Sequence, residues 1–247
     1  MSDNAGHGIR SVAGSTWERT QSEIRAFHKF GLLWAESGYD KVWAAAIQRV
    51  DENFDPDDHH GDEHVWRFDE QVEGMWPDRF GWMIHAAAIK DAVTAFEVYM
   101  EDVLREWLSH IRIGDGSVRP VVRVTKGRES PNWLVLTRFH ADLGANISTP
   151  SVREIRDLRH LLTHQRGELR SEAAIEKFTR TNAGDRFSRP RVGDPVELHT
   201  EDVLKVLADL DETVRATEHA IFERVGLLDS EIEAWETNGY ITVEPRT

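Results

Sequence analysis

Residues 151–170 read SVREIRDLRHLLTHQRGELR, and this stretch is the most informative part of the chain. If it forms a helix, residues three and four positions apart share a face, and the stretch sorts into two sides. One side collects basic, imidazole and hydroxyl side chains and then a glycine: Arg156, Arg159, His160, Thr163, His164 and Gly167. The opposite side is apolar: Val152, Ile155, Leu158, Leu161 or Leu162, and Leu169. Arginines and imidazoles held together on one rigid element are suited to binding a phosphate and to moving protons beside it.

The composition is that of an ordinary globular protein. The chain has 247 residues, 40% hydrophobic and 30% charged, which is enough for one or two domains with a large core. It has no cysteine, which excludes disulfides, thiol catalysis and cysteine-ligated zinc or iron–sulfur sites. No apolar run reaches the roughly 18 residues of a membrane span, and residues 1–8 contain no apolar signal core. We therefore expect no membrane association and a cytoplasmic location.

Charge is distributed unevenly along the chain. The net charge is −14, which argues against a broad nucleic-acid-binding surface, because such a surface needs clustered lysines and arginines. Residues 51–73 hold ten acidic residues and one basic residue, whereas residues 151–191 hold ten basic and six acidic residues. A local basic site on an acidic protein is therefore expected. Such a site suits a small or transient RNA contact better than processive binding.

Apolar residues recur with helical spacing over most of the chain, so the predicted fold class is all-α. Helices are expected over residues 17–50 with a break near Gly38, 82–111, 131–143, 150 onward, 200–226 and 231–237. Residues 120–125 fit either a short strand or an extended loop. Thr149 is the expected N-cap of the helix that starts at residue 150, with Pro150 at its first position. Ser151 and Glu154 offer an alternative capping box.

These elements suggest a division of the chain into four parts. Residues 1–16 are expected to be a flexible tail, and residues 17–80 an N-terminal helical extension with an acidic loop. Residues 81–228 are expected to form the main helical domain. Residues 229–247 are expected to form a short helix and a tail.

Part of the stretch 151–170 resembles the signature of the HEPN superfamily (higher eukaryotes and prokaryotes nucleotide-binding domains). This signature is an arginine and a histidine separated by four to six residues, and we call it the motif. Here the pair is Arg159 and His164, with the polar His160 directly after the arginine. The wider run from Leu158 to Gly167 looks like the form in bacterial ribonuclease-type members, in which Arg-Gly follows shortly after the catalytic histidine. The order of expected helices from about residue 82 to residue 226 is similar to that of an HEPN bundle.

The same spacing occurs a second time, at Arg105 and His110. We discount this pair because Glu106 follows the arginine and because Trp107 continues the apolar stripe of the helix expected over residues 82–111. It provides an internal comparison for the first pair.

The resemblance implies an all-α, HEPN-like helical bundle with an additional N-terminal helical segment. It also implies an endoribonuclease that cleaves RNA by attack of the 2′-OH and needs no metal or cofactor. In that mechanism His164 acts as general base or acid, Arg159 holds the scissile phosphate, and His160 tunes the site. Arg156 and Arg166 are the additional substrate-binding candidates.

The resemblance further implies partners. Sites in this family form across a two-fold dimer in which the motif helices face each other, so a homodimer is expected with RNA as its substrate. A toxin–antitoxin or antiviral defence system is the expected context, with an antitoxin or sensor protein as a possible partner.

Two other interpretations remain open. The chain could be a catalytically silent HEPN dimerisation or interaction module, in which Arg159 and His164 belong to an ordinary solvated helix face. It could also be a metal-dependent hydrolase. That hydrolase would use His160 and His164, or the loop that contains Asp55, Asp57, Asp58, His59, His60, Asp62, Glu63 and His64. The spacing of this loop matches no calcium loop, and no third ligand for the histidine pair is evident.

Overall fold

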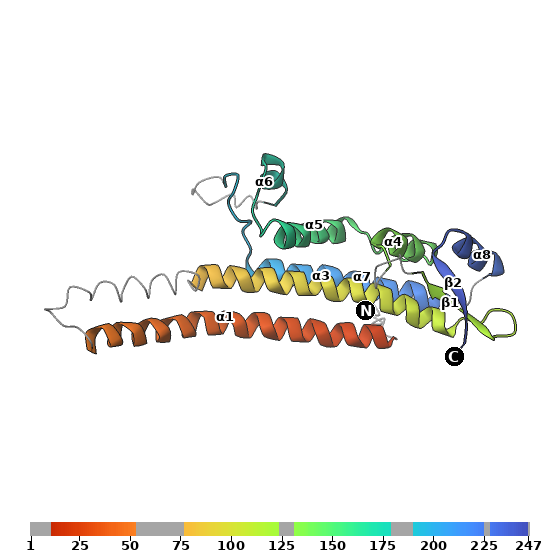
Figure 1. Ribbon diagram of the computed structural model, residues 1–247, viewed down its shortest axis with the longest axis horizontal. Coiled ribbons are helices and arrows are strands. Elements are labelled where there is room, and N and C mark those ends of the chain that lie inside the picture. Colours follow the sequence, from red (N-terminus) through yellow and green to blue (C-terminus); the bar gives the residue numbers. More distant parts are fainter. Residues whose placement is uncertain (1–10, 53–76, 124–130, 179–189, 225–227, 247) are drawn as a thin grey trace, which may run out of the picture. The chain divides into compact units, whose positions relative to one another are not determined.

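The computed structural model describes residues 11–52, 77–123, 131–178, 190–224 and 228–246. Within them the chain is a predominantly all-α helical bundle with a two-stranded sheet, which confirms the predicted fold class. In chain order the elements are α1 (Val12–Glu52), α3 (Pro77–His110), β1 (Val118–Val122), α4 (Trp133–Asp142), α5 (Pro150–His164), α6 (Glu172–Phe178), α7 (Thr200–Glu223), α8 (Asp229–Thr237) and β2 (Ile241–Pro245) (Figure 1). None of the described helices combines the length and apolar character that a membrane span requires.

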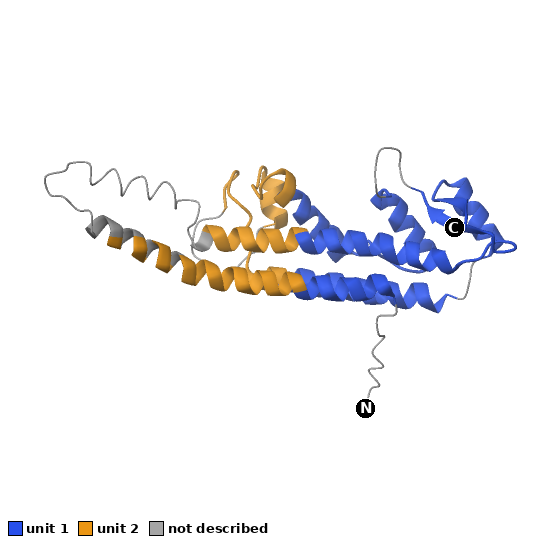
Figure 2. Ribbon diagram, turned by 60° about the horizontal axis from the view of Figure 1, so that its bottom comes forward, with its two compact units in different colours: residues 1–22, 91–161, 204–247 blue, residues 23–90, 162–203 orange. Residues whose placement is uncertain are grey.

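The chain divides into two compact units (Figure 2). Unit 1 comprises Met1–Ser22, Asp91–Leu161 and Leu204–Thr247, and unit 2 comprises Glu23–Lys90 and Leu162–Val203. The long helices α1 and α3 each contribute residues to both units. This division is a different one from the four parts expected from the sequence, and α1 begins inside the segment expected to be a tail.

In unit 1 the first turns of α1 pack on α3 and α7. Trp17 is buried, with its ring centroid 6.2 Å from that of Phe96 and 6.4 Å from that of Tyr99. Its indole nitrogen donates to Asp211 Oδ1 on α7 at 3.1 Å. Glu106 of α3 accepts the backbone N–H groups of Val12 and Ala13, each at 3.0 Å. A carboxylate thus satisfies amide groups that the first turn of a helix leaves without an intrahelical partner.

The C-terminal part of unit 1 is built around α4 and the sheet. Strands β1 and β2 pair antiparallel, with Val118 opposite Pro245 and Val122 opposite Ile241. The ring centroid of Trp235 on α8 lies 4.3 Å from that of Phe139 on α4. Together these contacts attach the last 20 or so residues to the helical core.

A fully buried histidine lies beside this aromatic pair. The ring nitrogen Nδ1 of His140 lies 2.9 Å from the carbonyl oxygen of Leu136, one turn earlier on α4. The Nε2 atom of His140 is buried and has no hydrogen-bond partner among the described residues. Burial lowers the pKa of His140 to about 4, so the ring is neutral near neutral pH.

In unit 2, α1 and α3 run antiparallel and approach closely. A Cβ atom added at Gly31 of α1 would lie 3.0 Å from Cδ1 of Ile84 on α3, so the glycine allows the close approach. The buried rings of His28 and His85 meet one turn away, with Nε2 of His28 2.8 Å from Nδ1 of His85. Burial lowers the pKa of both histidines.

Several boundaries differ from those expected. Helix α1 continues through Gly38 without a break, and the indole of Trp34 covers this glycine, 3.4 Å from the position of an added Cβ. The motif helix α5 ends at His164, so Gly167 and the residues after it lie beyond the helix. Strand β2 and helix α6 were not predicted, whereas β1 confirms the strand reading near residue 120.

Candidate functional site

Helix α5 begins as the sequence predicts. The hydroxyl oxygen of Thr149 accepts the backbone N–H of Val152 at 3.2 Å, and Pro150 is the first helical residue. The hydroxyl of Ser151 donates to the carboxylate of Asp209 on α7. These contacts in unit 1 fix where the motif helix starts and therefore which way its later residues point.

The apolar side of α5 is packed, as expected, and the histidines are on its exposed side. Val152 is fully buried, and Ile155, Leu161 and Leu162 are buried. His160, Thr163 and His164 are exposed, and Arg159 is half-buried. At 100° per residue, His160 and His164 lie about 40° apart around the helix, so their rings share one face.

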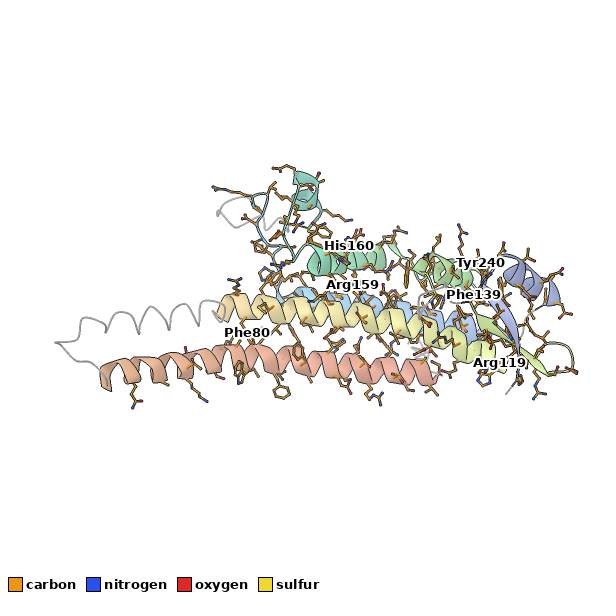
Figure 3. All side chains as sticks on the ribbon, viewed as in Figure 1. Phe80, Arg119, Phe139, Arg159, His160 and Tyr240 are labelled. Atoms are coloured by element: carbon orange, nitrogen blue, oxygen red, sulfur yellow. The ribbon has the colours of Figure 1, made fainter. Side chains whose placement is uncertain are left out.

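The helical spacing of the sequence predicts Arg159 on the side opposite the apolar residues, and the structure corrects this. Around the helix it is about 20° from the buried Val152, at the edge of the packed surface. It is separated from His164 by about 140°. Figure 3 shows Arg159 and His160 on α5. A single copy of α5 therefore presents the two motif side chains in different directions.

Arg156, a candidate for substrate binding, is engaged within unit 1. Its Nε donates to Glu97 Oε1 on α3 at 2.8 Å, and its guanidinium carbon lies 3.9 Å from the ring centroid of Trp133 on α4. The ring of Trp133 in turn lies 6.1 Å from that of Phe96. An arginine stacked on an aromatic ring and paired with a carboxylate joins α3, α4 and α5.

The Arg-Gly pair after the motif forms the turn that ends α5. Arg166 has φ 54° and Gly167 has φ 76°, and both values lie in the left-handed region. A Cβ atom at position 167 would lie 2.5 Å from the indole of Trp82 on α3 of the same unit. Only glycine accommodates both the backbone angle and the ring, so Gly167 is required for packing in unit 2.

Hydrogen bonds hold this turn in place. The indole N–H of Trp82 donates to the carbonyl of Val196 at 2.7 Å, and the N–H of Val196 donates to the carbonyl of Gly167 at 2.8 Å. The N–H of Leu169 donates to the carbonyl of Asp194 at 2.8 Å. The exposed Arg166, the second substrate-binding candidate, is therefore carried by a fixed backbone.

The two Arg–His pairs of the chain have different electrostatic environments. Arg105 pairs with Glu101 and lies 3.9 Å from Asp102, both on its own helix α3. Arg159 has no ion-pair or hydrogen-bond partner among the residues that the structure describes. Equal spacing in the sequence thus gives one neutralised arginine and one whose charge is available to an anion.

No arrangement for a metal ion is found in the described part of the chain. Those residues contain no group of three or more histidine, aspartate or glutamate side chains that could hold a metal ion. The acidic loop of residues 55–64 lies outside the described residues. His160 and His164 provide two imidazoles on one face, one short of the three protein ligands usual for catalytic zinc.

Two contacts of the site region were not anticipated from the sequence. The pairing of Glu97 with Arg156 joins helices that are far apart in the sequence. The contact of Trp82 with Gly167 spans 85 positions, and no local pattern indicates it. The Arg-Gly pair after the amphipathic helix was the available signal for a left-handed turn.

Comparisons of the chain with protein-family models, with curated proteins and with solved structures find no match. The resemblance to the HEPN signature therefore depends on the residues of this chain alone.

Proposed function

We propose that this protein is a metal-independent endoribonuclease of the HEPN type whose site lies on α5. The observation that carries the proposal concerns Arg159, which is half-buried at the edge of the packed side of the helix and has no acidic partner in the part of the chain that the structure describes. A guanidinium held this way can pair two of its N–H groups with two phosphate oxygens. The exposed His160 and His164 supply imidazoles, the side chains most often used as general acids and bases.

The proposed reaction is an internal transesterification. The ribose 2′-oxygen attacks the adjacent phosphorus as a general base removes its proton, and the bond from phosphorus to the 5′-oxygen breaks. A general acid then protonates the leaving 5′-oxygen. The products are a 2′,3′-cyclic phosphate and a 5′-hydroxyl end, with no net oxidation. His164 is assigned to acid–base transfer, His160 to tuning of the site and Arg159 to the charge on the phosphate.

The proposal includes a second copy of α5. Arg159 and His164 point about 140° apart on one helix, so one copy offers only part of the constellation. The family resemblance implies that motif helices face each other across a two-fold axis, and such an arrangement would complete the site. A toxin–antitoxin or antiviral defence role, with an antitoxin or sensor protein as regulator, belongs to the same proposal.

A catalytically silent interaction module is the second candidate. It is favoured by a group of exposed aromatic and aliphatic side chains on α1, including Phe27, Phe30 and Trp34. Exposed apolar clusters of this kind are typical of protein–protein contacts. Such a module would bind a partner without cleaving RNA.

The test is RNA cleavage by the purified full chain in EDTA. We expect cleavage of RNA to persist in the chelator, to leave 2′,3′-cyclic phosphate ends, and to be lost when the substrate carries 2′-deoxyribose at the cleaved position. Arg159→Ala and His164→Ala should each lower the rate by about 10² to 10⁴. Arg153→Ala is the matched control, because this exposed arginine lies on α5 outside the motif and, among the described residues, donates to the carbonyl of Ser148 alone.

Three outcomes would overturn the proposal. Wild-type protein that cleaves none of several RNAs would favour the interaction module. Cleavage abolished by EDTA and restored by a divalent cation would favour a metal-dependent hydrolase. Equal cleavage by wild type, Arg159→Ala and His164→Ala would place the activity elsewhere or in a contaminant.

A further inference from the structure

Two histidines are buried against each other where α1 packs on α3 in unit 2. His28 of α1 is 4% exposed and His85 of α3 is 8% exposed. Their ring centroids lie 5.0 Å apart, and Nε2 of His28 lies 2.8 Å from Nδ1 of His85. At this distance the two nitrogens share one hydrogen bond. We call these two residues the histidine pair.

The contact between the helices beside the histidine pair is apolar and close. A Cβ atom added at Gly31 would lie 3.0 Å from Cδ1 of Ile84, and one added at Gly81 would lie 3.6 Å from Cδ2 of Leu32. Apolar side chains at the two histidine positions would continue this contact at any pH. Two imidazoles make it sensitive to protons instead, because histidine changes its charge near neutral pH.

The two helices bring no carboxylate close to the histidine pair. On α1 the charged residues within one turn of His28 are Arg25 and Lys29, and both are exposed. On α3 residues 81–89 contain no charged residue besides the histidine of the pair. Neither helix therefore supplies a negative charge within one turn that would offset a proton on the pair.

A third segment of unit 2 faces the histidine pair with one charge of each kind. His199 directly precedes α7, and Glu201 lies in the first turn of α7. Burial lowers the pKa of His85 most, the charges of His28 and His199 lower it further, and Glu201 raises it. Nε2 of His199 also lies 4.0 Å from Oε2 of Glu197. The effects of His199 and Glu201 on His85 thus oppose each other.

The number of protons on the histidine pair decides whether its hydrogen bond can form. When both rings are neutral, the N–H of one ring donates to the lone pair of the other. One added proton leaves a donor and an acceptor in place. When both rings are protonated, both facing nitrogens carry hydrogen, so the hydrogen bond is lost and two positive charges repel each other. Burial lowers the pKa of both histidines, as expected for rings that resist this state.

We propose that the histidine pair is an acid-sensitive switch built into unit 2. It holds α1 on α3 while at most one of the two rings is protonated, and it releases the part of α1 around His28 when both rings are protonated. The first turns of α1 remain in unit 1, where Glu106 and Asp211 bind them. The switch is separate from the proposed ribonuclease site on α5, and it does not depend on RNA cleavage.

Hydrogen exchange of the full chain tests the switch. The released state takes up one or two protons near the ordinary histidine pKa of about 6.5, so acid favours release. We expect the opening of residues 24–35, corrected for the chemical exchange rate, to rise by about tenfold to hundredfold between about pH 7.5 and pH 5.5. An unchanged opening of these residues would overturn the proposal.

A double variant, His28→Leu with His85→Leu, assigns this rise to the histidine pair. Two leucines can pack on each other and leave no polar group without a partner at this position. The rise in residues 24–35 should disappear, whereas residues 12–22 should exchange as in the wild type. His140→Leu is the matched control, because it removes a buried histidine from unit 1 and should retain the rise. A rise that persists in the double variant, or that His140→Leu abolishes, would contradict the proposal.

Nuclear magnetic resonance of the imidazole rings tests the wild-type chain itself, and its result does not depend on whether a variant folds. The rings of His28 and His85 should both be mainly neutral at about pH 6.5, where an ordinary histidine is half protonated. Full protonation of both rings should coincide with the rise in the opening of residues 24–35. Two fully protonated rings in a chain whose residues 24–35 remain protected from exchange would overturn the proposal.

Discussion

Two segments of this protein carry an arginine and a histidine at the same spacing, yet their surroundings differ. Arg105 and His110 lie on α3, and Arg159 and His164 lie on α5. In both segments the histidine is the last residue of its helix. The local sequence thus builds nearly the same backbone twice.

The difference lies in what other residues contribute. Arg105 is paired with two acidic side chains of its own helix, whereas Arg159 has no such partner among the described residues. A glycine with positive φ follows each helix, and it is Gly114 after α3 and Gly167 after α5. No described heavy atom outside the immediate chain neighbours lies within 4 Å of a Cβ built at Gly114, whereas at Gly167 the indole of Trp82 is in the way. Equal spacing in the sequence therefore does not give equal surroundings in the fold.

The largest effect on stability is expected at the second glycine. Gly167→Ala should lower the free energy of unfolding by about 3 kcal/mol, because the left-handed angle is unfavourable for alanine and the new Cβ overlaps the ring of Trp82. Gly114→Ala should cost only about 1 kcal/mol, since it has the backbone penalty alone. Urea denaturation of both variants measures the contrast. Equal losses would show that the ring contact is unimportant.

The pH range in which the two segments can be compared is limited by His140. Its pKa is lowered to about 4 in the folded chain, whereas an unfolded chain binds a proton near the ordinary value of 6.5. The unfolded state therefore gains protons first as the pH falls, and stability should decrease by about 3 kcal/mol between pH 6.5 and pH 4.

Denaturation at several pH values, with His140→Leu beside the wild type, measures this effect. The stability of the variant should decrease much less than that of the wild type over this pH range, because leucine cannot be protonated. An unchanged slope in His140→Leu would assign the acid sensitivity to other groups, such as the buried pair of His28 and His85.

The arginines should divide into structural and functional ones. Arg156→Ala should lower the free energy of unfolding by about 1–2 kcal/mol, because it removes the pairing with Glu97 and the stacking on Trp133. Arg105→Ala should cost about 1 kcal/mol, since the arginine is half exposed and its pair with Asp102 is exposed, although its other partner Glu101 is buried. Arg159→Ala should change stability by less than about 0.5 kcal/mol.

Thermal or urea unfolding of these three variants measures the order. If Arg159→Ala lowers the free energy of unfolding as much as Arg156→Ala does, then Arg159 stabilises the fold. The proposed site would then lose its central argument.

The sequence predicts what is determined locally. The Thr149 cap and the Pro150 start of α5 follow from residue types at adjacent positions, and both are confirmed. The expected burial of Val152 and Ile155 is also confirmed, because helical spacing alone assigns them to one side. The fold class could be predicted for the same reason.

Long-range contacts account for what was missed. Helix α5 ends at His164 because the next residues turn around Trp82, which lies 85 positions away from Gly167. Strand β2 exists because Ile241 and its neighbours pair with β1, more than a hundred positions earlier. The engagement of Arg156 with Glu97 and Trp133 likewise depends on tertiary packing, which no spacing within α5 reveals.

The most direct test of the central claim compares single variants of the two segments in one RNA cleavage assay in EDTA near neutral pH. Arg159→Ala and His164→Ala should lower the cleavage rate by about 10² to 10⁴, whereas Arg105→Ala and His110→Ala should cleave at the wild-type rate. Equal rates for all four variants, or a loss confined to Arg105→Ala and His110→Ala, would contradict the assignment of the site to α5.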